Sequence, residues 1–395
     1  MFRIQVLANH FLSPDILGGG DRVFIELCRN WQRKGVEVSV ACPKNGKTLC
    51  ESCGLDADYE IIPGSFLERA PSLLAIPLLF IARALNTCVM RLPYGKQIML
   101  YTPGDFICNV IPAAFLRRVC GDRATWAAHV FFVIPPPFSR QLSFVRDVIS
   151  FFLQRLSFSL MRRYADLVIV LNSTTRGQLI RCGIPEEKIF ISSGGVDLAQ
   201  IEAAESGIDS PYDACFVGRI HPGKGVLDLA EIWEKVVAIK SDARLAIVGS
   251  GSPYYVDMLV ESLRAKNIAR NVDMLGFRAS PFGLMKSSKI LLYPDHEAGY
   301  GWGLAVCEAL ACGIPVVAYD LPVYREFFQE GMSLVRFRNT AEFAKATLDV
   351  LDNDSKRKDL GRRGKDFVRK YDWKGVSDTL LSALEEIPRG EPIVS

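Results

Sequence analysis

Residues 297–320, EAGYGWGLAVCEALACGIPVVAYD, decide the fold, because one short stretch joins a glycine-rich loop, a helix and an apolar strand. The segment before them, KILLYPD (289–295), is typical of a buried strand. Apolar residues then recur at helical spacing from Leu304 until Gly313 ends the helix, and PVVAY (315–319) resumes a strand. The stretch therefore predicts a strand–loop–helix–strand unit, with glycines where strand becomes helix.

The glycines at that junction favour an anion. Gly301 and Gly303 remove side chains where a ligand would approach the backbone, and the next helical turn offers unpaired amides at its positive end. One turn further on, Glu308 could accept hydrogen bonds from ligand hydroxyls, as an acidic residue does from a ribose. We therefore interpret the stretch as a nucleotide site. The alternative is that the glycines only turn the chain and that Glu308 is a solvated helix residue.

Length and composition describe a folded protein of more than one domain. At 395 residues the chain is long enough for two or three domains, and 49% hydrophobic residues suffice for sizeable cores. Its eleven cysteines lie mostly in apolar runs, as reduced thiols do, which predicts a cytoplasmic location. Cys50 and Cys53 form one CxxC without a second pair, so we expect a structural role and no metal site.

Basic residues cluster in the first half of the chain. Between Arg83 and Arg163 there are eleven Lys or Arg residues against three Asp or Glu residues, interleaved with apolar segments. The apolar run 73–82 is far shorter than the ~20 residues that span a bilayer, and the N-terminus is strand-like rather than a signal peptide. This mixture fits either peripheral binding to an anionic membrane on its cytoplasmic face or a packed domain with basic outer faces. The basic segment 356–370 is typical of a solvated helix face, so no nucleic acid partner is expected.

Strands and helices alternate along nearly the whole chain. The pattern predicts an α/β protein of two Rossmann-like domains with mostly parallel sheets, at 1–200 and 201–372, and a C-terminal helix within 373–395 that returns to the first domain. The polar segment 199–212 is predicted to be a structureless linker. Glycines end several strands, which predicts loops built for close approach at the carboxyl edges of the sheets.

Three motifs, in this order and spacing, resemble the retaining glycosyltransferases of the GT-B fold, family 4, also called the group 1 type. They are GRIHPGKG (218–225), IVGSG (247–251) and GYGWGLAVCEALACGIPVVA (299–318). In the first half, GGGDR (18–22) and the segment 165–197 are also similar to that family. The resemblance covers nearly the whole chain, and its C-terminal half is the specific part. It implies two Rossmann-like domains that face each other across a cleft.

The resemblance also implies a donor and the residues that bind it. A nucleoside diphosphate sugar would be the donor, with no metal and no other cofactor. Arg219 and Lys224 match the residues that hold the diphosphate, and Glu308 matches the acid that accepts the ribose hydroxyls. The other residues that we predict to bind the donor are Gly19, Gly20, Gly218, Gly249, Gly251, Phe277, Tyr300, Gly301, Trp302, Gly303 and Leu304.

This sequence departs from the family pattern at one position. The family has a first Glu eight residues before the second, and that position is Tyr300 here. Either Glu297 reaches the donor sugar in its place, which we favour, or the Tyr300 hydroxyl takes over with a different sugar preference. In the first domain, His129 is the best match to a catalytic histidine near the sugar, although a core histidine is an equal alternative. His10, near the Gly18–Gly20 loop, is a weaker candidate.

The sequence therefore predicts a retaining, metal-independent transfer of a sugar to an acceptor hydroxyl, in glycan, lipopolysaccharide or glycolipid synthesis. The acceptor would be a glycan, a lipid-linked saccharide or a small molecule. Two alternatives stay open: a sugar-nucleotide epimerase of similar fold, and a catalytically weak scaffold that binds the nucleotide sugar. A nicotinamide dehydrogenase fits poorly, because LGGGDRVF (17–24) lacks the GxGxxG spacing.

Overall fold

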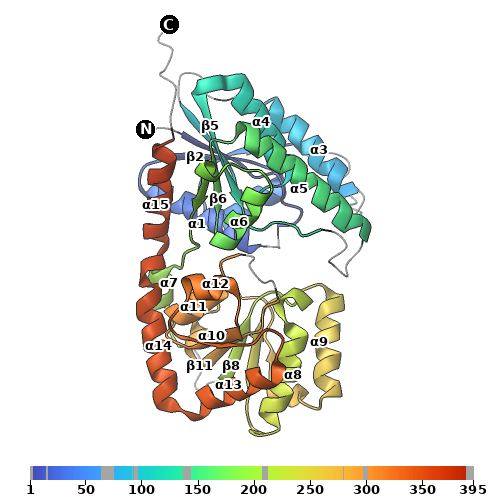
Figure 1. The fold of residues 1–395 in the computed structure, drawn as a ribbon, viewed down its shortest axis with the longest axis vertical. Helices are drawn as coiled ribbons and strands as arrows, with labels where there is room; N and C mark the ends of the chain where they lie inside the picture. Colours follow the sequence, from blue (N-terminus) through green and yellow to red (C-terminus); the bar gives the residue numbers. More distant parts are fainter. Residues whose placement is uncertain are drawn as a thin grey trace. The chain divides into compact units, whose positions relative to one another are not determined.

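A computed structural model of the 395-residue chain describes residues 3–14, 17–63, 75–90, 92, 97–136, 144–206, 212–278, 280–296 and 301–387. The chain forms two compact units (Figure 1). Unit 1 contains the residues up to Gly194 and those from Trp373 onward, and unit 2 is Gly195–Asp372. Among the described helices, none has the length and apolar character needed to cross a membrane.

Unit 1 is built on a parallel sheet of seven strands in the order β3-β2-β1-β4-β5-β6-β7. Its strands are β1 (Arg3–Leu7), β2 (Glu37–Cys42), β3 (Asp58–Ile61), β4 (Ile98–Thr102), β5 (Ala124–Val130), β6 (Leu167–Val170) and β7 (Ile189–Ile191). Its helices are α1 (Gly19–Arg33), α2 (Lys44–Ser52), α3 (Ala75–Cys88), α4 (Ile107–Cys120), α5 (Phe144–Tyr164), α6 (Ser173–Arg181) and α15 (Trp373–Glu385). Helix α4 packs between α3 and α5, and α15 packs against α1.

Unit 2 is built on a parallel sheet of six strands in the order β10-β9-β8-β11-β12-β13. Its strands are β8 (Tyr212–Val217), β9 (Leu245–Val248), β10 (Val272–Met274), β11 (Ser288–Tyr293), β12 (Val316–Tyr319) and β13 (Met332–Val335). Its helices are α7 (Leu198–Ala203), α8 (Val226–Val237), α9 (Pro253–Ala265), α10 (Phe282–Lys286), α11 (Leu304–Ala311), α12 (Pro322–Phe327), α13 (Thr340–Asp352) and α14 (Asp354–Val368).

The sequence pattern explains these elements. Central strands are apolar throughout because helices cover both faces of a parallel sheet, and every residue of β5 is buried. The predicted α/β class with two Rossmann-like units is confirmed. The predicted structureless linker at 199–212 is wrong at its start, where α7 forms: the Asp197 side chain caps the helix by accepting a hydrogen bond from the Gln200 amide at 2.8 Å.

The strand orders fix where each unit can bind a ligand. Neighbouring strands whose connections leave in opposite directions open a crevice at their carboxyl ends. In unit 1 this switch lies between β1 and β4, and in unit 2 between β8 and β11. The loops that follow these four strands are therefore the first places to look for a site.

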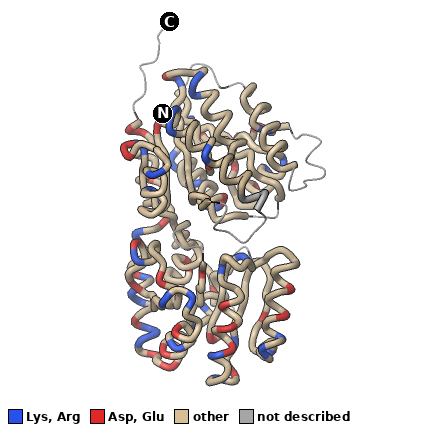
Figure 2. The backbone as a smooth tube through the Cα atoms, turned by 45° about the vertical axis from the view of Figure 1, so that its right-hand side comes forward, with Lys and Arg blue, Asp and Glu red and all other residues tan. Residues whose placement is uncertain are grey.

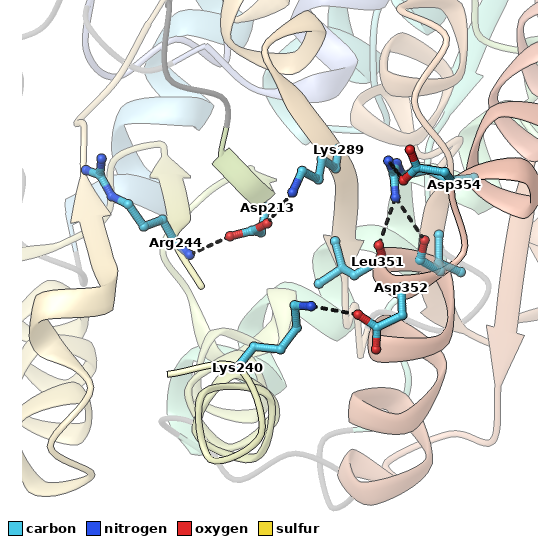
Figure 3. A network of polar contacts seen from close by, with 9 residues as sticks. Asp213, Lys240, Arg244, Lys289, Leu351, Asp352 and Asp354 are labelled. Atoms are coloured by element: carbon cyan, nitrogen blue, oxygen red, sulfur yellow. Dashed lines mark hydrogen bonds and ion pairs between the residues drawn. The ribbon is translucent and has the colours of Figure 1, made fainter. Parts of the chain in front are cut away.

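Charged residues at the opposite, amino edge of the unit 2 sheet have structural partners (Figure 3). Asp213 at the start of β8 accepts a hydrogen bond from the Lys289 ammonium of β11 at 2.7 Å and from the Arg244 amide at 3.0 Å. Lys240 donates to Asp352 at the end of α13 at 2.6 Å. These contacts hold strand starts and a helix end together, so we assign them to the fold rather than to a site.

Charge is distributed differently in the two units (Figure 2). In unit 2, α14 carries many residues of both signs, and several of its basic side chains have acidic partners, as Arg362 does in Asp359 at 2.7 Å. In unit 1, the layer formed by α3, α4 and α5 carries few charges, and most of them are basic.

Candidate functional site

Two loops meet at the switch point of unit 2. The loop after β8 runs through residues 218–225, and the loop after β11 begins at Pro294. The His296 amide donates to the Gly223 carbonyl at 2.9 Å, and a Cβ at Gly225 would lie 1.7 Å from the Pro294 carbonyl oxygen. Gly225 also has a φ of +66°, in the left-handed region that glycine favours. The backbones of the two loops are therefore packed directly against each other.

The cation that this packing places at the junction is Lys224. Its ammonium lies 3.1 Å from the Asp295 carboxylate and 5.9 Å from the centre of the Tyr293 ring. Both side chains of the pair are largely buried, with 16% and 6% exposure. Arg219, on the same loop, is exposed. The loop after β8 thus carries two cations, Lys224 held by an ion pair and Arg219 exposed. Asp295 belongs to this site as well, although the sequence pattern did not identify it.

A second network supports the same junction. The Asp228 carboxylate accepts a hydrogen bond from the Tyr319 hydroxyl at 2.6 Å and lies 2.8 Å from His296 Nε2. Burial by itself raises the pKa of Asp228, but the hydrogen bonds from His296 and Tyr319 outweigh burial and hold that pKa below its ordinary value. Asp228 is therefore a stable anion that orients His296, whose amide in turn binds the Gly223 carbonyl.

The helix α11 follows the loop after β11 and begins at the same carboxyl edge of the sheet. Gly303 is its N-cap with a φ of +79°, and Gly301 has a φ of +78°. A Cβ at Gly301 would meet no described atom within 4 Å, so the backbone there borders open space. Leu304 is the first helical residue, and Glu308, in the second turn, is 5% exposed. The helix amino terminus and a buried carboxylate thus lie on one short helix, as the sequence predicts.

Three of the other predicted donor residues have a packing role in the structure. The Trp302 ring is 2% exposed and lies 4.4 Å from the Phe327 ring centre, so a ligand would have to use its backbone. A Cβ at Gly249 would lie 1.8 Å from the Gly218 carbonyl oxygen, and one at Gly251 would lie 2.2 Å from a neighbouring carbonyl. These two glycines permit contact between the loops after β8 and β9. Phe277, after β10, is 63% exposed and available for contact.

The alternative between Glu297 and Tyr300 stays a prediction. Both residues lie outside the part of the chain that the structure describes.

In unit 1, His129 is the next-to-last residue of the buried strand β5. Its Nδ1 is 3.0 Å from the Tyr101 hydroxyl, and its ring stacks on Phe131 at 4.3 Å. Its Nε2 is buried and has no hydrogen-bond partner among the described residues. Phe131 also approaches the first turn of α1, because a Cβ at Gly20 would lie 2.7 Å from its ring. Gly19 is the first residue of α1. An unsatisfied buried nitrogen is uncommon, so this histidine is either a core residue under strain or the partner of a ligand hydroxyl.

We predict that His129 makes the protein acid-sensitive. Burial lowers the pKa of His129 to about 3, whereas an unfolded histidine titrates near 6.5. Between these values the unfolded chain binds the extra proton, so stability falls as the pH falls. From pH 7 to 5 the free energy of unfolding should drop by about 2 kcal/mol more in the wild type than in His129→Gln, measured by urea titration. Equal losses in the two proteins would contradict this assignment.

Both ring nitrogens of His10, in the loop after β1, have polar partners. Its Nε2 lies 2.8 Å from the Asp21 carboxylate, its Nδ1 lies 3.2 Å from the Asn109 side-chain amide, and its ring stacks on Phe106 at 4.8 Å. Asp21 also accepts from the Gly18 amide at 2.8 Å, which caps α1. Because both ring nitrogens have partners, the contacts of His10 tie the first loop of unit 1 to α4.

The loops after β8 and β11 lie in a part of the chain that is similar to known proteins. Residues 200–367 match the family model of glycosyl transferases, group 1. A phosphatidyl-myo-inositol mannosyltransferase of Mycobacterium leprae is 30% identical over 179 residues, which are 44% of this chain and 46% of that protein. A D-inositol 3-phosphate glycosyltransferase of Segniliparus rotundus is 30% identical over 222 residues, 52% of this chain and 48% of that protein. The chain thus spans about half the length of the curated relatives it matches.

Solved structures are similar over the whole chain. The Anabaena protein HepE, solved with UDP and glucose, has a TM-score of 0.74 at 17% identity and covers 98% of this chain and 100% of its own. A sucrose-phosphate synthase of Thermosynechococcus elongatus has a TM-score of 0.75 at 15% identity and covers 98% of this chain and 99% of its own. At these identities the likeness establishes the fold.

Proposed function

We propose that this protein transfers a sugar from a nucleoside diphosphate sugar to an acceptor hydroxyl, because residues 200–367 match the family model of group 1 glycosyl transferases and the chain has the GT-B fold. The observation that carries the proposal is the junction at the switch point of unit 2. There Lys224, Arg219 and the amino terminus of α11 supply positive charge beside open backbone at Gly301.

The donor diphosphate fits this junction on electrostatic grounds. Departure of a nucleoside diphosphate builds negative charge on phosphate oxygens, and preorganised cations and helix amides stabilise such charge as it forms. The Lys224 ammonium is already oriented by Asp295 at 3.1 Å, so little reorganisation is needed. Glu308 would accept the ribose hydroxyls, and exposed Phe277 would contact the base. The HepE structure with UDP supports a uridine nucleotide as the first candidate.

We propose a retaining reaction without a metal. No protein nucleophile is required if the acceptor attacks on the face that the diphosphate leaves and a phosphate oxygen takes the acceptor proton. Such a path places all charge stabilisation on Lys224, Arg219 and helix amides. The names of the curated relatives refer to an inositol lipid or to inositol phosphate. They support an acceptor in glycolipid or glycan synthesis.

A thermal-shift screen of nucleotide sugars tests the donor, and acceptor-dependent donor consumption tests the reaction. A donor at a hundred times its dissociation constant should stabilise the protein by about 2.7 kcal/mol. Glu308→Gln keeps the size of the side chain, so we expect a native melting temperature and a donor affinity about tenfold lower, as for loss of a charged hydrogen bond. Consumption of donor without any acceptor would instead indicate an epimerase, and stabilisation without consumption would indicate a scaffold.

A further inference from the structure

The outer faces of α3, α4 and α5 share an apolar surface that no other described part of unit 1 covers. We call it the α3–α5 face. It consists of exposed large hydrophobic side chains from each helix and from the residue after α3: Leu78, Ile81, Leu85, Val89, Phe115, Val119, Phe152 and Leu156. Val89 is 80% exposed and Phe152 is 65% exposed.

The spacing of these residues places them on one side of each helix. Phe115 and Val119 are four residues apart on α4, Phe152 and Leu156 are four apart on α5, and the α3 residues follow at intervals of three and four. Because α4 packs against both of the other helices, the three stripes come from neighbouring helices, which Figure 1 shows as ribbons. Contiguous exposed apolar surface of this kind marks an interaction site.

Basic residues border the face at the carboxyl ends of the helices. Arg118, Arg162 and Arg163 are exposed there, and Arg118 donates to the Tyr164 hydroxyl at 3.2 Å, which joins the ends of α4 and α5. Exposed Arg123 follows α4, next to exposed Asp122. A further carboxylate nearby, that of Asp166, is engaged by Arg117 through two hydrogen bonds of 2.9 and 3.1 Å. The border therefore has a positive net charge.

We propose that the α3–α5 face binds an anionic phospholipid surface, with its apolar side chains in the lipid interface and its arginines on the head groups. Apolar side chains beside cations suit shallow insertion at such a surface. A second copy of the chain would bring together two borders in which the exposed arginines outnumber exposed Asp122, so charge complementarity favours lipid. This inference does not rest on the transferase proposal.

Arg155, one of the eleven basic residues between Arg83 and Arg163, has a packing role instead. Its guanidinium lies 4.6 Å from the Phe151 ring centre and 5.5 Å from that of Phe158, and it donates to the Cys182 sulfur at 2.7 Å. Charge reversal there would disturb the packing of α5. The charge-reversal test below therefore uses Arg118 and leaves Arg155 unchanged.

Flotation of the full chain with vesicles tests the proposal. Wild type should float with phosphatidylcholine vesicles that contain phosphatidylglycerol, less so at high salt, and should not float with phosphatidylcholine alone. Leu85→Asp with Phe152→Asp should weaken binding at least about tenfold, whereas Ile239→Asp, at a 71% exposed position of unit 2, should leave it unchanged.

Charge reversal gives the second arm. Glutamate at Arg118, Arg162 and Arg163 should weaken binding by about a hundredfold, because each cation near an anionic leaflet contributes roughly fivefold. The same reversal at Arg336, Arg362 and Arg369, which are exposed in unit 2, changes the net charge equally and should have little effect.

Three results would overturn the proposal. One is the absence of wild-type flotation at low salt, and another is equal flotation of the wild type and the Leu85→Asp, Phe152→Asp variant. The third is self-association in sedimentation velocity that the same variant abolishes while vesicles bind nothing, which would assign the face to a second copy. Should that variant melt below wild type, Leu78→Asp with Val119→Asp, at 57% and 64% exposed positions, replaces it.

Discussion

Replacing Arg219 by alanine should weaken donor binding by about 1.5–3 kcal/mol, roughly ten- to a hundredfold, without changing the melting temperature. The side chain is exposed in the structure, so its removal leaves the core intact. A charge-assisted contact to a diphosphate would account for the loss. Isothermal calorimetry with the nucleoside diphosphate measures it directly. Wild-type affinity in this variant would remove Arg219 from the proposed site.

Lys224 needs a compensated variant, because its ammonium neutralises buried Asp295 at 3.1 Å. Lys224→Ala alone leaves that carboxylate without this cation and should lower stability as well as affinity. Lys224→Ala with Asp295→Asn should recover stability while donor binding stays ten- to a hundredfold weaker than wild type. Asp295→Asn alone keeps the ammonium and should bind donor at least as well as wild type. Recovery of donor binding in the double variant would contradict a phosphate role for Lys224.

Much of the fold could be predicted because buried parallel strands are continuous apolar runs. The strand predicted at 315–319 is β12, Val316–Tyr319. Elements without such a pattern were missed: β3 (Asp58–Ile61) is a mostly exposed edge strand of polar sequence, and α7 has only six residues and depends on its Asp197 cap.

The candidate site was predictable only where one segment carries it. The loop with Lys224 and the start of α11 are each continuous in sequence, so their glycines and charges form a readable motif. Asp228, His296 and Tyr319 come from three different elements, and strand order alone brings them together. No local signal marks such a network. The contact roles of Gly249 and Gly251 were missed for the same reason, since their partners lie on another loop.

The two glycines Gly225 and Gly301 should lose stability to very different degrees when replaced by alanine. Both have left-handed backbones, with φ of +66° and +78°, so the intrinsic strain of an alanine is similar, about 1–2 kcal/mol. They differ in surroundings. A Cβ at Gly225 would lie 1.7 Å from the Pro294 carbonyl oxygen, a contact that only backbone movement relieves, whereas one at Gly301 would meet no described atom within 4 Å.

Gly225→Ala should therefore lower the free energy of unfolding by more than about 4 kcal/mol, because it separates the two loops that form the junction. Gly301→Ala should fold with a loss of only about 1–2 kcal/mol. If the open backbone at Gly301 is where the donor approaches, its added methyl group should weaken donor binding more than tenfold, a loss of about 1.4 kcal/mol or more. Denaturant unfolding and calorimetry with the nucleoside diphosphate separate the two effects. Native donor affinity in Gly301→Ala would show that the glycine only turns the chain.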